Sequence, residues 1–99
     1  MAGADDLLVI TPTERGVTLA GEIDAHTAPA LAEAIHGIDG DVEIEMSGVE
    51  FVDSSGLRVL IDAHQHVDER GDHLRLVNLS DAVRRLLEIS GVDDYLNVG

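Results

Sequence analysis

Two adjacent serines, Ser54 and Ser55, stand between Asp53 and Gly56 at the point where an apolar run gives way to a helical pattern. Serine and aspartate at such a boundary are typical helix caps, because their oxygens accept hydrogen bonds from the unpaired amides of the first turn. The same turn carries the positive end of the helix dipole and binds phosphate well. The segment therefore supports two compatible interpretations: a helix cap, and a serine that can carry a phosphate without disrupting the fold.

Two aspartates, Asp24 and Asp53, each follow an apolar, strand-like segment and precede a helical pattern by a few residues. In a sheet of parallel strands such ends emerge at one edge, which is where α/β proteins place their sites. Each aspartate can cap a helix. Alternatively, the two carboxylates line one acidic surface beside Ser54. The spacing alone leaves both interpretations open.

The five histidines do not have the spacing of a metal site. His64 and His66 are two residues apart, which turns their side chains toward different faces of a helix. The other three, His26, His36 and His73, fall in separate elements, so no pair has the i, i+4 spacing of helical metal ligands. We therefore expect no metal site.

Catalytic and nucleotide-binding motifs are absent from the sequence. Ser54 does not lie in a Gly-x-Ser-x-Gly elbow, and no histidine–aspartate pair is singled out as its base and orienter. No Gly-x-x-x-x-Gly-Lys loop occurs. Because the chain has no cysteine, it has neither thiolate ligands nor a cysteine nucleophile. We therefore expect neither catalytic residues nor a cofactor.

The excess of acidic side chains argues against two classes of binding partner, nucleic acids and anionic membranes. The 99 residues include 20 acidic and 6 basic side chains, for a net charge of -14. Binding to nucleic acid or to an anionic membrane draws on Lys and Arg, so we expect neither. No apolar run approaches the roughly 18 residues of a membrane span, and we expect no signal peptide. We expect residues 1–99 to form a single domain of a soluble, cytoplasmic protein.

Hydrophobic periodicity predicts an α/β fold with the order β-β-α-β-α-β-α-β. Strands that alternate with helices form a mixed, mostly parallel sheet packed against the helices, in which the first strand is free to run antiparallel. Helices are expected after the caps Thr27 and Ser80 and from Ser54 to about Glu69, the last helix ending at Gly91. Strands are expected at 7–10, 17–19, 42–46, 74–77 and 95–98, with an aliphatic core centred on Ile44, Leu60, Ile61, Leu76 and Leu86.

Three segments together resemble a known family. They are Gly21-Glu22-Ile23-Asp24 with Thr27 shortly after, Asp53-Ser54-Ser55-Gly56-Leu57, and Ser80-x-x-Val83-x-Arg85-Leu86-Leu87 with Ser90-Gly91. In this order and at this spacing, over nearly the whole chain, they resemble the STAS domain and, more narrowly, the bacterial anti-sigma factor antagonists. The resemblance implies a STAS-like α/β fold and a partner-switching protein that is not an enzyme.

The resemblance further implies a mechanism. An unphosphorylated family member binds an anti-sigma factor that is also a serine kinase, and this frees the sigma factor. The kinase phosphorylates the serine directly after the aspartate, here Ser54, and the phosphorylated antagonist dissociates from the kinase. A serine phosphatase then removes the phosphate and restores the binding form. The implied partner-binding residues are Asp24, Asp53, Ser55 and Gly56, with Ser55 a neighbour of the acceptor. The alternative is a STAS adaptor without a phosphoswitch, in a stress-signalling or lipid-transport assembly.

Overall fold

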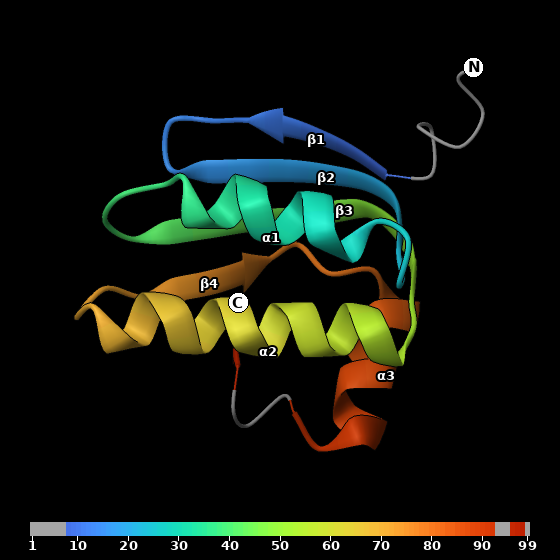
Figure 1. Ribbon diagram of the computed structural model, residues 1–99. Coiled ribbons are helices and arrows are strands. Elements are labelled where there is room, and N and C mark those ends of the chain that lie inside the picture. The colour runs from blue at the N-terminus through green and yellow to red at the C-terminus, as the bar shows by residue number, and fades with distance from the viewer. Residues whose placement is uncertain (1–7, 93–95, 99) are drawn as a thin grey trace.

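The structure, a computed structural model, describes residues 8–92 and 96–98. In these ranges strands and helices follow one another in the predicted order (Figure 1). None of the described helices is long and apolar enough to cross a membrane. The elements are β1 Leu8–Pro12, β2 Gly16–Ile23, α1 Ala28–His36, β3 Val42–Val52, α2 Ser54–Glu69, β4 Leu74–Val77, α3 Asp81–Ser90 and β5 Asn97–Val98.

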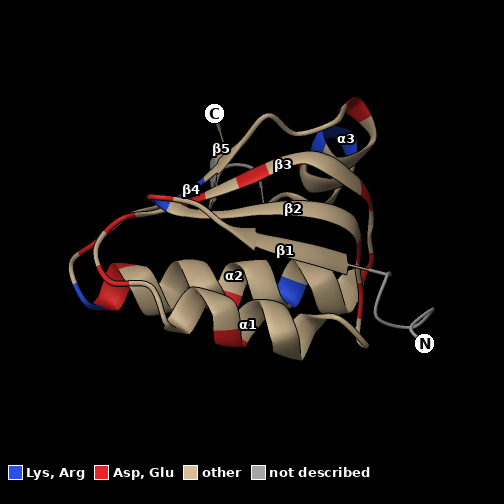
Figure 2. Cartoon of the chain, turned by 90° about the horizontal axis from the view of Figure 1, so that it is seen from above, with Lys and Arg blue, Asp and Glu red and all other residues tan. Residues whose placement is uncertain are grey.

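The strands form one sheet in the order β1-β2-β3-β4-β5. β1 pairs antiparallel with β2, and the other neighbouring strands pair in parallel. α1 and α2 cover one face of the sheet, and α3 lies on the opposite face (Figure 2). This arrangement confirms the predicted mixed, mostly parallel α/β fold. It also supplies the strand order, which periodicity does not encode.

Three strands extend beyond their predicted last residues, β1 to Pro12, β2 to Ile23 and β3 to Val52. The pairing of β2 with β3 contains register shifts, and such irregularities interrupt the alternation of apolar and polar residues from which strands are predicted. The predicted first residues of the two outer strands, Leu7 and Tyr95, lie outside the described residues.

The core lies between the sheet and its helices and is aliphatic. Ile44, Leu60 and Leu76 are fully buried, as predicted. The other two predicted core residues, Ile61 and Leu86, are only partly buried and pack against the edge of the core. Ile61 follows the fully buried Leu60, and Leu86 precedes the fully buried Leu87. The inward face of each helix is therefore centred about one residue away from its predicted position.

The third helix begins and ends at the predicted residues. Ser80 is its N-cap, and the Ser80 hydroxyl accepts a hydrogen bond from the backbone N–H of Val83 at 3.3 Å. Gly91 ends the helix at φ 75°, in the left-handed region that glycine adopts without a Cβ penalty. Local capping chemistry therefore determines both ends of α3.

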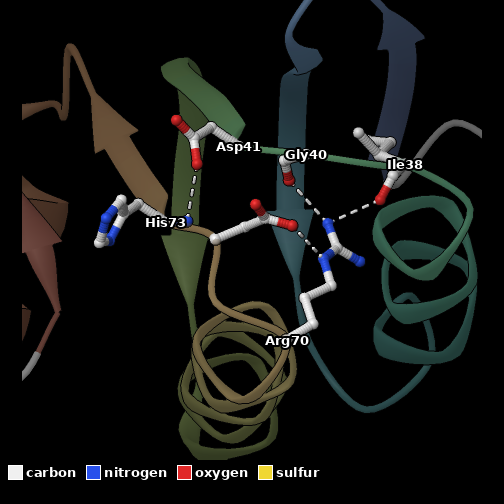
Figure 3. A network of polar contacts seen from close by, with 6 residues as sticks. Ile38, Gly40, Asp41, Arg70 and His73 are labelled. Carbon is white, nitrogen blue, oxygen red and sulfur yellow. Dashed lines mark hydrogen bonds and ion pairs between the residues drawn. The ribbon is translucent and has the colours of Figure 1, made fainter.

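Arg70 joins two loops at the C-terminal end of α2 (Figure 3). Its Nη2 donates to the carbonyl oxygens of Ile38 and Gly40, each at 2.7 Å. Its Nε donates to Asp72 Oδ2 at 2.9 Å. These contacts hold the α1–β3 connection against the α2–β4 connection, so this end of the molecule has a structural role.

Glu45 on β3 makes two hydrogen bonds that favour its ionised form. Its carboxylate accepts from Asn78 Nδ2 at 2.6 Å and from the backbone N–H of Ser47 at 2.8 Å. These bonds, the one from Asn78 above all, lower the pKa of the Glu45 carboxyl below its ordinary value. The resulting stabilisation is complete above the ordinary pKa of a glutamate. It is lost as the pH falls through the lowered pKa of the folded state.

We therefore expect the free energy of unfolding of Glu45→Gln to decline less than that of the parent protein as the pH drops from about 5 to about 3. Urea unfolding at a series of pH values measures this difference. Glu50→Gln removes the same charge from the same strand and is the control. Equal acid sensitivity of the two variants would show that the hydrogen bonds of Glu45 do not contribute.

Candidate functional site

The ends of β2 and β3 place Asp24 and Asp53 at the same edge of the sheet. The two strands are parallel and Ile23 lies opposite Val52, so each aspartate directly follows its strand at the same level. The backbone N–H of Asp53 donates to the Ile23 carbonyl at 3.1 Å, which joins the two strand ends. The prediction that the ends of the two strands before Asp24 and Asp53 emerge at one edge of the sheet is confirmed.

Asp53 is the N-cap of α2. Its backbone is extended, with φ -96° and ψ -173°, and its Oδ1 accepts a hydrogen bond from the backbone N–H of Gly56 at 2.9 Å. Ser54 is the first helical residue, and its exposed side chain has no hydrogen-bond partner among the described residues. The interpretation of Ser54 as a cap is therefore wrong, because a helix has one N-cap position and Asp53 occupies it. The Ser54 hydroxyl remains available for other chemistry.

Gly56 lies where the start of α2 packs closely against the end of β2. It is buried, and a Cβ at this position would lie 2.3 Å from the carbonyl oxygen of Ile23 and 2.8 Å from Val52 Cγ1. Because atoms cannot approach so closely, any side chain here would push the helix away from the sheet. Gly56 therefore sets the position of Ser54 and Ser55 and offers no side chain of its own to a partner.

Asp24 shapes the turn between β2 and α1. Its Oδ1 accepts hydrogen bonds from the backbone N–H groups of His26 and Thr27, both at 3.0 Å. The buried Thr27 hydroxyl accepts from the Asp24 N–H at 2.9 Å and donates to the Glu22 carbonyl at 3.0 Å. Thr27 occupies the N-cap position of α1, but its side chain does not cap the helix. The predicted capping by this hydroxyl is wrong because the turn already uses it.

A groove of about 420 Å³ runs between α1 and α2 beside this edge, and the sequence did not predict it. Small residues on the α1 side leave room for it. Hydrophobic periodicity shows which face of each helix is apolar, but not how far apart two helices lie, so the groove has no signal in the sequence. It is lined by Ala25, Ala28, Pro29, Ala32, His36, Ser55, Arg58, Val59, Asp62 and Ala63.

Two histidines connect the helices that form the groove. The rings of His36 on α1 and His66 on α2 are stacked, with centroids 4.1 Å apart and an angle of 27° between their planes. In the sequence they belong to separate elements, so this pairing depends on the packing of the helices. Within the described ranges, no group of three or more His, Cys, Asp or Glu side chains could hold a metal ion.

Comparison with known proteins identifies the family of this chain and supports the fold. A sequence model of the family described as "Mlab, STAS domain" matches residues 8–98. The match includes every strand and helix described above, and with them the Asp53-Ser54-Ser55-Gly56 turn. The chain therefore belongs to the STAS domain family.

Within this family, the chain belongs to the anti-sigma factor antagonists, which are regulators and not enzymes. It is 35% identical to the anti-sigma-B factor antagonist of Bacillus subtilis over 85 residues, which cover 83% of this chain and 78% of that protein. An anti-sigma factor antagonist from Mycobacterium paratuberculosis has a similar crystal structure, with a TM-score of 0.75 and 29% identity over 92% of this chain and 82% of that one. The Bacillus cell fate determinant SpoIIAA, in its phosphorylated form, shares the fold with a TM-score of 0.66 and 19% identity over 93% of this chain and 90% of the other.

Proposed function

We propose that this chain, as one STAS domain over residues 1–99, is an anti-sigma factor antagonist switched by phosphorylation of Ser54. Unmodified, it binds an anti-sigma factor that is also a serine kinase, and the sigma factor is released. The kinase then phosphorylates Ser54, the complex dissociates, and a serine phosphatase restores the binding form. The Bacillus subtilis relative, named as an antagonist of an anti-sigma factor, supports this class of partner.

The observation that carries the proposal is the environment of the Ser54 side chain. It is exposed at the first position of α2 and has no partner among the described residues, whereas Ser55 is partly buried in the groove wall. A kinase can therefore reach Ser54 without breaking a contact that holds the fold together. The amides and dipole of the helix N-terminus also favour the added negative charge.

We assign the partner-binding surface to the sheet edge around Ser54 and to the adjoining α1–α2 groove. Asp24 and Asp53 each use Oδ1 in a turn or cap, which leaves Oδ2 of both side chains without a hydrogen bond from the described residues. These oxygens are available to donors on a partner. Ser55 lines the groove. Gly56 allows the start of α2 to pack closely against the end of β2, and this position of the helix brings both serines to the edge of the sheet.

Incubation with ATP and a candidate anti-sigma kinase, followed by mass spectrometry, tests the assignment of the acceptor. We expect one phosphate on the parent protein, at Ser54, none on Ser54→Ala, and one phosphate on Ser55→Ala, in which the acceptor hydroxyl is intact. A pull-down with Ser54→Ala should retain the kinase, because this variant cannot be released by phosphorylation. A partner that binds the protein but never phosphorylates it would favour the adaptor function instead.

Substitutions of Asp24 separate its role in the turn from a role in partner binding. Asparagine keeps an acceptor oxygen for the N–H groups of His26 and Thr27, so Asp24→Asn should melt close to the parent temperature. Alanine removes both hydrogen bonds and should lower the free energy of unfolding by about 0.5–2 kcal/mol. If Asp24 contacts the partner, Asp24→Asn also weakens kinase binding.

Thermal unfolding and calorimetric binding of both variants measure these effects. Asp68→Asn, which removes a charge from an exposed position near the far end of α2, is the matched control. Normal partner binding by Asp24→Asn would remove Asp24 from the proposed surface and leave it with its role in the turn.

A further inference from the structure

Arg58 is placed to contact a phosphate on Ser54. The two residues are four apart on α2, so their side chains lie on the same face of the helix, with Cβ atoms about 5–6 Å apart. Arg58 is the only Arg or Lys in α2, and 84% of its side chain is exposed. Among the described residues its ion-pair partner is Asp62, at 3.9 Å between Nε and Oδ2, and that side chain is 62% exposed. Such a long and exposed ion pair holds Arg58 only weakly.

We propose that phosphorylation of Ser54 transfers Arg58 from Asp62 to the phosphate, an inference that rests on the proposed function for the phosphate itself. Phosphoserine carries a charge of about -1.5 to -2, against -1 for Asp62. An acidic group four residues before a basic one forms the stronger helical pair, and Asp62 lies on the weaker, C-terminal side of Arg58. A guanidinium also binds phosphate through two parallel hydrogen bonds.

The transfer carries the effect of phosphorylation along α2 into the groove. Arg58 and Asp62 both line the α1–α2 groove, and the helical rise separates Ser54 from Asp62 by about 12 Å. After the transfer, Asp62 is an unpaired carboxylate in the groove wall, and Arg58 offsets part of the phosphate charge. Phosphorylation therefore changes the charge pattern of the groove as well as that of the sheet edge.

Phosphoserine incorporated at position 54 through an expanded genetic code provides the modified 99-residue chain without any kinase. Titration followed by phosphorus NMR measures the second pKa of the phosphate, which is ordinarily about 6. Because a paired arginine favours the dianion, Arg58→Gln should raise this pKa by about 0.3. Arg85→Gln removes the same charge from an exposed position on α3 and should leave it unchanged.

Equal phosphate pKa values in Arg58→Gln and Arg85→Gln would overturn the proposal. A higher phosphate pKa in Asp62→Asn than in the parent protein would also overturn the proposal. Removal of the competing Asp62 carboxylate should strengthen the pair between Arg58 and the phosphate, and therefore lower this pKa. Circular dichroism of each variant shows whether α2 is intact. Since the phosphate is installed without a kinase, failure of the arginine transfer and failure of the proposed kinase switch give separate results.

Discussion

Phosphorylation of Ser54 is expected to weaken binding to an anti-sigma factor by ten- to a thousandfold while leaving the fold intact. The phosphate adds a charge of about -1.5 to -2 to an exposed side chain that has no hydrogen bond from the described residues. At an effective dielectric constant near 20, one charge about 7 Å from an acidic group of the partner costs roughly 2 kcal/mol, and two charges cost roughly 4. Each 1.4 kcal/mol changes the affinity about tenfold.

Calorimetric titration of the unmodified and phosphorylated proteins with the partner measures the loss of affinity. Backbone amide spectra of the same two samples show whether the change is local to the start of α2 and the groove. Ser55→Ala, phosphorylated in the same way, is the control and should lose affinity to the same extent. An affinity that stays within about twofold after modification would refute the switch. Shifts throughout the sheet would instead show that the switch acts by a change of conformation.

Gly56→Ala is expected to lower the free energy of unfolding by about 3 kcal/mol, even though alanine is the better helix former by about 1 kcal/mol. The added Cβ would lie 2.3 Å from the carbonyl oxygen of Ile23, and this oxygen already accepts the N–H of Asp53. Backbone on one side and the Val52 side chain on the other leave little room for relaxation. To relieve the contact, the start of α2 must move, and Ser54 moves with it.

Gly37→Ala is the matched control for this experiment. Gly37 has φ -81°, and a Cβ there would lie no closer than 3.7 Å to any neighbouring atom, which is ordinary contact. Alanine at this position should be neutral or stabilise the protein by about 0.4–1 kcal/mol, because it restricts the unfolded chain. Urea unfolding compares the two variants. Equal stabilities would mean that α2 does not approach β2 as closely as the structure shows.

The sequence by itself determined the features that depend on neighbouring residues. Helix caps are short-range interactions, so Ser80 before α3 and Gly91 after it could be identified from residue type and spacing. The order of strands and helices followed from periodicity, because each element must turn an apolar face toward the core. Even here, the sequence could not distinguish Asp53 from Ser54 as the cap, since both residue types can cap a helix and only backbone geometry decides between them.

The tertiary structure decided everything that depends on contacts between distant segments. The strand order, the groove between α1 and α2, and the stack of His36 on His66 all arise from how whole elements pack, which no local pattern records. The role of Gly56 is of the same kind, because it is set by a carbonyl oxygen 33 positions earlier in the chain, at Ile23. A glycine in a helical pattern signals only that a side chain is missing. The reason for its absence is a close approach of two backbones that exists only once the chain has folded.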